Sequence, residues 1–310
     1  MTAEAASLTG AEFDALFHEV SNWDRWGPDR SSLGTLNYLT PDHVAAAADL
    51  VRSGESVSLS LDIGTDARPD NPVPAQHRMT QLPDDESGPE QFIKDFVGTN
   101  YHNDGHTHLD ALCHVSYHGR LFGGVPDSSA TENGAMLGDI SSVSNGIVGR
   151  GVLLDIPRLH SVPWQQPGDQ VSVDELLAAE ESQGVKVGPG DLLFVRLGHN
   201  QRLATMGSWD TTIAKAGLHP STARLFSERR IAVLGSDTNS DAAPSTTEGV
   251  PFPIHVLAIN AMGLYLLDYL QLDDLAGMCE RDGRWEFFCV VAPLRMPHAT
   301  GSPVNPIAVF

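Results

Sequence analysis

The fold class of this chain is decided by the stretch GRGVLLDIPRLHSVPWQQPGDQVSVDELLAAEESQGVKVGPGDLLFVRLG, residues 149–198. Within it, the apolar run from Gly151 to Ile156 predicts a short buried strand. Ser172, with a glutamate three residues later, forms a capping box and predicts a helix that ends near Gly184. The run from Leu192 to Leu197 predicts a second strand. A strand, a helix and a further strand in this order are typical of α/β proteins.

The same alternation continues on both sides of this stretch. Upstream, Thr40 and Pro41 start an Ala-rich helix that is expected to end at Gly54, within a helical N-terminal segment over about residues 1–54. Residues 66–90 are rich in Pro, Asp and Gln without periodicity, so we expect a long irregular excursion of the kind that covers binding sites. Further strands are expected at 57–63, 231–235, 263–270 and 285–294, with helices near 220–230 and 254–262 and an apolar C-terminal segment, 301–310, packed back onto the body.

The composition favours one folded domain and excludes several kinds of partner. Hydrophobic residues make up 41% of the 310 residues, and no Ser/Gly/Pro-rich linker separates two cores, so we expect a single domain over residues 1–310. The formal net charge of −21 repels phosphate backbones, which argues against nucleic acid as a partner. The chain has no apolar run of membrane-spanning length and no signal-peptide pattern. We therefore expect no membrane association and a cytoplasmic location.

Histidines are concentrated in one short run, HNDGHTHLDALCHVSYH, residues 102–118, which holds five of the thirteen. If residues 104–110 are extended, side chains alternate, and Asp104, His106, His108 and Asp110 share one face. Imidazole and carboxylate are the usual ligands of a catalytic divalent metal. Two or three of these side chains plus a ligand from elsewhere would leave one coordination position open for water.

Three other histidines of the run have different expected roles. His114 lies four residues past Asp110; if a helix starts at Ala111, His114 lies one turn away and can exchange a proton with a metal-activated water. His102 and His118, at the two ends of the run, are expected at the surface or in a supporting position. The alternative for the whole run is a polar surface loop with solvated histidines.

A second group of polar residues lies far downstream. Asp237 and Asp241 follow the strand expected at 231–235, and loops at strand ends are where α/β proteins place functional side chains. His255 follows a proline at an expected helix start, where it either reaches inward or caps the helix. Asp268 lies in an apolar run and needs a partner because an unpaired buried carboxylate is costly. A metal or His255 would serve.

The run HTHLDALCH, residues 106–114, resembles the signature HxGTHxDxxxH of the cyclase-like metal-dependent hydrolases, the family that includes bacterial kynurenine formamidase and isatin hydrolase. Further blocks similar to this family follow the same order, at 22–44, 149–156, 188–198, 233–241 and 250–268. The resemblance implies a mixed, partly barrel-like β-sheet flanked by helices. It also implies assembly as a homodimer or a larger homo-oligomer such as a homotetramer.

The resemblance also assigns roles to individual residues. It implies that His108 and Asp110 are metal ligands and that His114 transfers protons. The downstream metal-associated histidine of the family falls on His255, and the acidic residue that follows it falls on Asp268.

Two positions depart from the family pattern. The family's first histidine falls on Asp104 and its glycine on His106, so the first ligand is either replaced by a carboxylate or moved two residues along. Asp268 stands where the formamidases usually have the longer glutamate. These changes could alter the metal, weaken a second metal ion, or leave a scaffold without full activity.

The hypothesis is therefore a metal-dependent hydrolase that cleaves a small cyclic amide, lactone or N-formyl compound with a water activated by Mn²⁺ or Zn²⁺. Trp23, Trp26 and Phe122 are candidates for the wall of an aromatic-binding pocket, with ordinary packing as the alternative. A lyase or cyclase using the same metal is the enzymatic alternative, and a binding protein that has lost its metal is the other. No GxSxG, P-loop, GxGxxG, HExxH or paired CxxC motif supports another site type.

Overall fold

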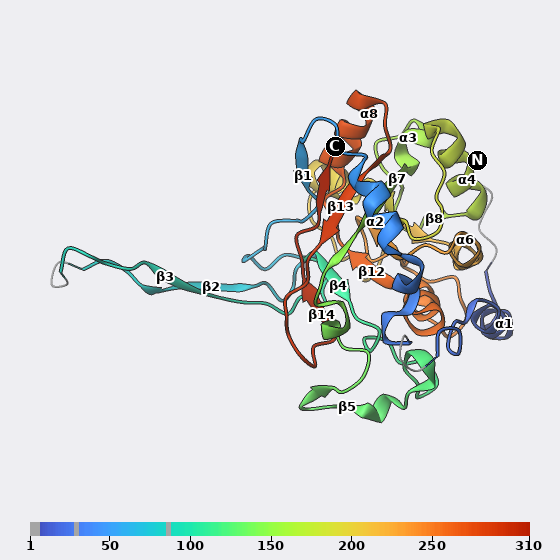
Figure 1. Ribbon diagram of the computed structural model, residues 1–310, viewed down its shortest axis with the longest axis horizontal. Helices are drawn as coiled ribbons and strands as arrows, with labels where there is room; N and C mark the ends of the chain where they lie inside the picture. The colour runs from blue at the N-terminus through green and yellow to red at the C-terminus, as the bar shows by residue number, and fades with distance from the viewer. Residues whose placement is uncertain (1–6, 28–30, 85–87) are drawn as a thin grey trace.

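The computed structural model describes residues 7–27, 31–84 and 88–310. In these residues nine strands form one mixed sheet with helices packed around it (Figure 1). The strand order across the sheet is β1-β15-β13-β7-β9-β11-β12-β4-β14. The strands are β1 (Ser56–Ser58), β4 (His108–Asp110), β7 (Ile147–Asp155), β9 (Leu192–Arg196), β11 (Val233–Ser236), β12 (Tyr265–Asp268), β13 (Glu286–Val291), β14 (Gly301–Pro303) and β15 (Ile307–Val309).

The four neighbouring strands β7, β9, β11 and β12 run parallel and form the centre of the sheet. Their continuous apolar runs are explained by burial on both faces, as in parallel sheets generally. Val152 and Leu154 of β7 join one core with the helices α1, α4 and α6, whereas Leu153 joins a second core with Phe194 and Phe287. The four strands predicted over 151–156, 192–197, 231–235 and 263–270 are confirmed, with ends shifted by up to four residues.

The helices begin where the capping signals predict but do not all end there. Helix α4 has the capping box of Ser172 and ends at Gly184, whose φ of 64° requires the left-handed conformation that glycine adopts readily. Helix α2 begins after the Thr40 cap but ends at Ala48, short of Gly54. The helices are α1 (Gly10–Val20), α2 (Pro41–Ala48), α3 (Ile156–His160), α4 (Val173–Gln183), α5 (His199–Met206), α6 (Thr222–Arg229), α7 (Pro253–His255), the π-helical η5 (Val256–Met262) and α8 (Asp273–Asp282).

The N-terminal segment over about residues 1–54 holds three helical stretches among its described residues, joined by non-helical chain such as residues 21–27 and 49–54. It contains α1, the 3₁₀ segment η1 (Ser31–Tyr38) and α2. Residues 1–6 and 28–30 of that prediction lie outside the described residues. Helix α1 packs beside η5, and α2 packs against β7 and β13.

The end of the sheet formed by β1 curls back toward the strands near the opposite end, beside β12. After β1, the N–H of Leu59 donates to the carbonyl of Pro306, and Ser60 forms a bridge with Leu270, just beyond β12. The N–H of Gln271 in turn donates to the carbonyl of Leu59 over 2.9 Å. The sheet is therefore partly closed, and the predicted α/β fold with a mixed, partly barrel-like sheet flanked by helices is confirmed. The C-terminal residues pack back as β14 and β15, at two separate places in this sheet.

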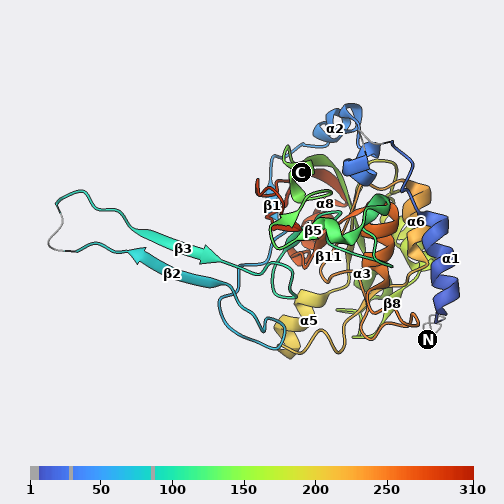
Figure 2. The same ribbon diagram turned by 90° about the horizontal axis from the view of Figure 1, so that it is seen from below.

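Residues 66–90 differ from the irregular excursion predicted for them. Strand β2 (Gln76–Gln81) pairs antiparallel with β3 (Lys94–Gly98), and the two project from the body as a long arm (Figure 2). All six residues of β2 are exposed, so its sequence QHRMTQ carries no buried-face periodicity for a strand prediction to detect. Residues 85–87, within the predicted excursion, lie outside the described residues.

The remaining elements are short. The described residues contain no helix that is both long enough and apolar enough to span a bilayer. The short elements are β5 (Ala130–Thr131), β6 (Gly134–Ala135), β8 (Gln170–Val171), β10 (Gly217–Leu218) and the 3₁₀ turns η2 (Phe122–Gly124), η3 (Asp127–Ser129) and η4 (Ile140–Val143).

Candidate metal centre

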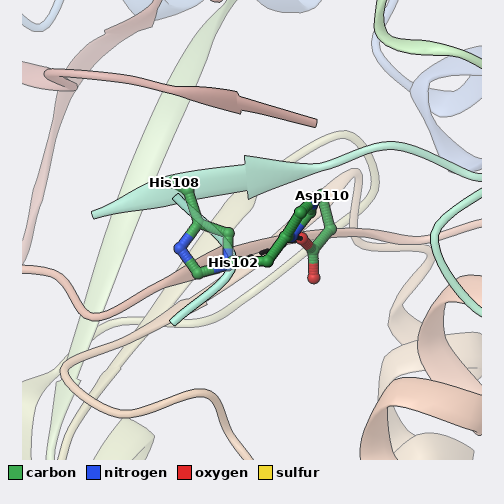
Figure 3. A group of neighbouring side chains, drawn as sticks. All are labelled: His102, His108 and Asp110. Carbon is green, nitrogen blue, oxygen red and sulfur yellow. Dashed lines mark ion pairs between the residues drawn. The ribbon is translucent and has the colours of Figure 1, made fainter. Parts of the chain in front are cut away.

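The site is built on β4, a three-residue strand buried between β12 and β14. Side chains alternate along a strand, so His108 and Asp110 lie on one side of it (Figure 3), while Leu109 enters the apolar core on the other. In the antiparallel pairing of β4 with β12, Asp268 lies opposite His108. The strand register therefore brings a second buried carboxylate to the same side.

His102 completes one group of possible ligands with His108 and Asp110. His102 Nδ1 lies 2.9 Å from Asp110 Oδ1, and His108 Nε2 lies 3.5 Å from the same oxygen. The other ring nitrogens are occupied: His108 Nδ1 donates to the carbonyl of His106 over 2.8 Å, and His102 Nε2 shares a hydrogen bond with the Thr300 hydroxyl over 2.9 Å. Such hydrogen bonds fix the orientation of each ring and leave its second nitrogen, which faces Asp110, available to bind a metal.

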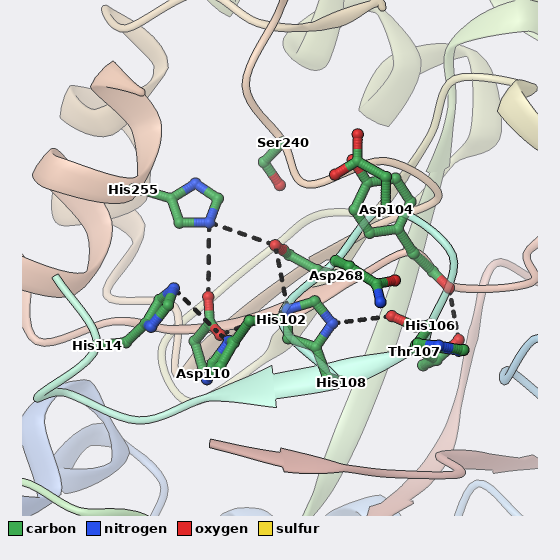
Figure 4. Close-up of polar contacts among 12 residues, drawn as sticks. His102, Asp104, His106, Thr107, His108, Asp110, His114, Ser240, His255 and Asp268 are labelled. Atoms are coloured by element: carbon green, nitrogen blue, oxygen red, sulfur yellow. Dashed lines mark hydrogen bonds and ion pairs between the residues drawn. The ribbon is translucent and has the colours of Figure 1, made fainter. Parts of the chain in front are cut away.

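His255 approaches Asp110 from the opposite side (Figure 4). Its Nε2 lies 3.5 Å from Asp110 Oδ2 and 3.3 Å from Asp268 Oδ2, and its Nδ1 donates to Asp241 Oδ2 over 2.6 Å. Asp110, His114 and His255 form a second group whose ligand atoms lie close together. Asp110 is thus shared by the two possible ligand groups: His102, His108 and His114 face Oδ1, and His255 faces Oδ2.

The buried carboxylates have the chemistry that a bound cation would satisfy. Both oxygens of Asp110 and Oδ1 of Asp268 are buried and have no hydrogen-bond partner among the described residues. His102 Nδ1 also lacks one, although it lies 2.9 Å from Asp110 Oδ1. His102 Nδ1 and Asp110 Oδ1 are therefore close enough to coordinate the same metal ion. Because unpaired buried carboxylates are costly, the residues fit a divalent metal.

The electrostatics of the cluster keep Asp110 ionised and His114 neutral. Burial raises the pKa of Asp110, but His114 and the other surrounding histidines outweigh it, so that pKa lies well below its usual value. Burial lowers the pKa of His114 to about 4 against the opposing effect of Asp110. Burial raises the pKa of Asp268. His114 is therefore an unprotonated imidazole at neutral pH, which is the form that accepts a proton.

His114 lies beside the cluster without the helix expected at Ala111. Residues 111–114 form a turn, in which the N–H of His114 donates to the carbonyl of Ala111 over 3.0 Å. The turn still leaves His114 Nε2 3.9 Å from Asp110 Oδ1. The ring of His114 stacks on that of His102, with ring centres 3.9 Å apart. The side chain remains 28% exposed, so it can exchange protons with solvent in the cavity.

Of the predicted ligands, the structure brings together His108, Asp110, His255 and Asp268, and it does not bring Asp104 and His106 to them. Only residues 108–110 are extended, because the N–H of Gly105 bonds to Asn103 Oδ1 and the chain turns there. Asp104 instead accepts hydrogen bonds from Thr211 and Lys215. His106 is buried, and neither of its ring nitrogens has a hydrogen-bond partner among the described residues.

His102 belongs to the cluster, although the sequence predicted a surface or supporting position for it. The Asn-Asp-Gly sequence at 103–105 is a turn signal, and it would have indicated that the preceding histidine folds back onto the strand. His118 lies apart from the cluster: its side chain is 73% exposed, and Nε2 is 3.7 Å from Asp14. Asp237, of the downstream group, accepts three backbone N–H bonds around the start of α5 and serves the fold.

A cavity of about 500 Å³ opens beside the cluster. That volume suits a small organic ligand. Its apolar wall comes from Val115, Tyr117, Val250, Phe252 and neighbouring side chains, and its polar wall includes His108, His114, His255, Asp268 and Asp104.

The aromatic residues predicted for the pocket wall lie elsewhere. Trp23 and Phe122 line a second cavity of about 360 Å³. Trp23 Nε1 also donates to the carbonyl of Asn260, and Trp26 packs edge-on against Tyr38. These contacts are the ordinary packing that was the alternative for these residues.

Known proteins similar to this chain share its fold. The Cyclase family model, described as "Putative cyclase", matches residues 57–242. The crystal structure of a novel cyclase is 30% identical, with a TM-score of 0.83, and the match covers 94% of this chain and 99% of that one. No curated protein matches.

More distant structures share the fold alone. Isatin hydrolase A from Labrenzia aggregata, bound to benzyl benzoate, is 21% identical with a TM-score of 0.59, over 84% of this chain and 94% of that one. A predicted metal-dependent hydrolase from Bacillus stearothermophilus is 15% identical with a TM-score of 0.52, over 82% and 97%. The family match spans more than half of the residues, and the novel cyclase matches almost end to end. The chain therefore belongs to the Cyclase family.

Proposed function

We propose that this protein is a metal-dependent hydrolase that cleaves a small cyclic amide, lactone or N-formyl compound. One observation carries the proposal: Asp110 is fully buried with two unbonded oxygens, and four histidine nitrogens surround it. Such a cluster is poorly suited to a purely structural role, because it leaves the oxygens of a buried carboxylate without hydrogen-bond partners among the described residues. Structurally similar proteins include hydrolases, which supports this reaction class.

The residues that would hold the metal are His102, His108 and Asp110, with Asp268 and His255 adjacent. Imidazole and carboxylate donors suit Zn²⁺ and Mn²⁺. Asp104, which the sequence offered as a first ligand, lies outside this group. When bound, such an ion lowers the pKa of a water molecule and polarises a carbonyl.

The chain's own residues then handle the proton and the substrate. His114 is neutral, partly exposed and next to Asp110, so it is placed to take a proton from the attacking water and return it to the leaving nitrogen or oxygen. Asp241 holds the ring of His255 in one orientation through its hydrogen bond to Nδ1. The apolar wall with Val250 and Phe252 receives the carbon skeleton of the substrate and limits access of bulk water.

The test combines metal analysis with a substrate panel. The purified protein is analysed for bound metal and assayed with lactones, cyclic imides and formanilides in ¹⁸O-labelled water. We expect about one or two equivalents of Zn²⁺ or Mn²⁺ and one labelled oxygen in the carboxylate that each hydrolysed substrate yields. His108→Ala should lose both metal and activity, and His118→Ala, which alters an exposed histidine outside the cluster, should keep both.

Two outcomes would overturn the proposal. Absence of metal from the wild type and from the His108→Ala variant alike would favour a binding protein on the same fold. Conversion of a substrate without uptake of labelled oxygen would favour a lyase or cyclase.

A further inference from the structure

The loop after β11 carries a polar side chain that the metal centre does not use. Asn239 lies in the run GSDTNSD, residues 235–241, in which Asp237 serves the fold and Asp241 holds His255. Asn239 lines the cavity beside the cluster, and only 6% of its surface is exposed. Because a buried amide normally bonds within the protein, the partners of this one decide what it does.

Asn239 has no hydrogen-bond partner among the described residues. Its Oδ1 is enclosed by protein atoms and bonds to none of them. Its Nδ2 is the polar atom that remains accessible, at the wall of the cavity. Leaving a buried amide unpaired costs free energy, and such a group in a folded protein needs an explanation. A ligand in the cavity supplies one if it accepts a hydrogen bond from Nδ2.

The other amide and hydroxyl side chains of the cavity wall already bond within the protein. They are Asn103, bonded to two backbone carbonyls, Ser116, bonded to Asp127, Tyr117, bonded to Asp14, and Tyr269, bonded to Lys215 and Asp104. Among the described residues of this wall, Asn239 is therefore the one amide or hydroxyl side chain without a partner. It is the neutral donor that the fold leaves for a ligand.

The backbone on both sides of Asn239 is held in place. The carbonyl of Thr238 accepts the N–H of Tyr269 over 2.9 Å, and the carbonyl of Ser240 accepts the N–H of Leu218 over 2.8 Å. Ser240 has a φ of 67°, a left-handed conformation that is costly for a non-glycine residue, and its N–H bonds to Thr238 Oγ1. The loop thus presents the Asn239 amide from a fixed backbone.

The same anchors bring Asn239 to the metal centre. Tyr269, which bonds the residue before Asn239, directly follows Asp268 in the sequence. Asp241, two residues after Asn239, bonds the ring of His255 over 2.6 Å. Figure 4 shows Ser240, the next residue, on the same side of the cluster as His255. The amide therefore meets the cavity close to the groups that surround Asp110.

We propose that Asn239 is a catalytic residue whose Nδ2 donates a hydrogen bond to the carbonyl oxygen of the substrate and stabilises the negative charge that this oxygen gains. The inference rests on the proposed function and adds to it a group that touches the reacting atoms. As the oxygen of water bonds to the carbonyl carbon, the π electron pair of the carbonyl moves onto its oxygen, and a proton of the water passes to His114. A donor that is fixed before the reaction stabilises this charge without reorganisation.

The experiment replaces the amide by side chains that cannot donate a hydrogen bond. Asn239→Leu keeps the size of the side chain, and Asn239→Ala is the second variant in case leucine does not fit. Asn133→Leu, at an exposed position in the turn between β5 and β6, is the matched control. For each protein we measure bound metal, the melting temperature, and kcat and KM on the best substrate of the panel. Calorimetry with phthalamate, the ring-opened product of phthalimide, gives a Kd without turnover.

We expect kcat of Asn239→Leu to fall about 10²- to 10³-fold with KM within a few fold of the wild type, because the hydrogen bond strengthens in the transition state. The Kd of phthalamate should rise about 10-fold or more, since one of its carboxylate oxygens is the former carbonyl oxygen. The melting temperature should not fall, because leucine removes an unpaired amide, and the metal content should not change. Asn133→Leu should match the wild type in every measurement.

Three results would overturn the assignment. The first is a kcat of Asn239→Leu within a few fold of the wild type. The second is a rise in KM alone, which would place the amide in binding of the ground state. The third is a loss of activity that follows a loss of metal or of folded protein in both variants, which would make Asn239 a structural residue.

The binding measurement separates failure of this inference from failure of the proposed function. A wild type that hydrolyses the panel, with Asn239 variants that do so equally well, contradicts only the role of Asn239. A wild type that binds phthalamate more tightly than the Asn239 variants but hydrolyses nothing contradicts the hydrolase proposal and keeps the donor. A wild type that neither binds phthalamate nor hydrolyses any member of the panel counts against both.

Discussion

Asp241 and His255 form a hydrogen bond of 2.6 Å between Oδ2 and Nδ1, and this bond turns His255 Nε2 toward Asp110 and Asp268. Asp241 also accepts the backbone N–H of Ile254 on its other oxygen, over 2.6 Å. Asp241 thus fixes both the backbone of helix α7 and the orientation of the His255 ring on that helix. Carboxylate–histidine pairs behind a metal usually tune the affinity of the site.

We therefore predict that Asp241→Asn weakens metal binding about 10- to 100-fold. The amide keeps the size of the side chain but is a weaker acceptor, so His255 loses its fixed tautomer. Competition titration with a chelator of known affinity measures the change. Asp210→Asn, which alters an exposed carboxylate bonded to its own loop, should bind metal like the wild type. An unchanged affinity in Asp241→Asn would show that the orientation of His255 does not contribute.

For His114, we predict loss of turnover without loss of metal. His114→Gln should lower kcat about 10²- to 10⁴-fold, because it removes the proton acceptor, while His102, His108 and Asp110 still hold the ion. The assay is steady-state kinetics on the best substrate of the panel, together with metal analysis. If the variant loses metal in parallel with activity, His114 is a ligand of the second group and not the proton-transfer residue.

The sequence was informative where a site depends on local geometry. Alternation along β4 was enough to place His108 and Asp110 on one side of the strand. The apolar runs of β7, β9, β11 and β12 predicted central strands because parallel strands are buried on both faces.

What could not be predicted depends on pairing between distant segments or on turns that reverse the chain. Asp268 reaches the site because β12 pairs with β4, residues that are far apart in sequence. His102 lies in the cluster and Asp104 lies outside it, the reverse of what the sequence predicted. The reason is a turn at Asn103, which interrupts the extended segment. Strands β2 and β3 were missed because an exposed hairpin has no core-facing periodicity.

His199 should make the stability of the metal-free protein depend on pH. Burial, followed by the charge of Lys215, lowers the pKa of His199 to about 4 from an ordinary value of 6.5. Between these values the unfolded chain binds a proton that the folded chain does not, so this residue reduces stability as the pH falls from 6.5 to 4. The full loss is on the order of 3 kcal/mol, since one pKa unit corresponds to about 1.4 kcal/mol.

The variant His199→Phe isolates this contribution. Phenylalanine keeps the ring contacts with Trp209 and Tyr269 but cannot be protonated. Urea unfolding of both metal-free proteins at pH 7.5 and pH 4.5 gives the difference in unfolding free energy. We expect a smaller loss on acidification in the variant. An equal loss in the two proteins would mean that His199 does not resist protonation in the folded state.

The β2–β3 arm exposes apolar side chains, and the family resemblance implies a homo-oligomer that such a surface would suit. Phe92, Ile93 and Val97 are 57%, 64% and 52% exposed, and the arm projects away from its own body (Figure 2). A lone two-stranded hairpin is only marginally stable in water, and exposed apolar patches of this kind mark association sites. Strand β2 carries Arg78 and no acidic residue, whereas Glu90 near the tip is acidic. If two arms cross antiparallel, the tip of one arm, with Glu90, lies against strand β2 of the other, with Arg78. We therefore propose a second copy of this chain as the partner.

The double variant Phe92→Asp/Ile93→Asp should therefore dissociate the assembly. Two added charges per arm are costly to bury, and in a symmetric contact each copy contributes the same patch, so the effect is doubled. Light scattering coupled to gel filtration should give a multiple of 33.3 kDa for the wild type and the mass of one chain for the variant. Met206→Asp/Ile213→Asp alters equally exposed apolar side chains on the body and should keep the wild-type mass. A monomeric wild type, or an arm variant with unchanged mass, would show that the arm does not join copies of this chain, because the substituted side chains would then lie outside any interface.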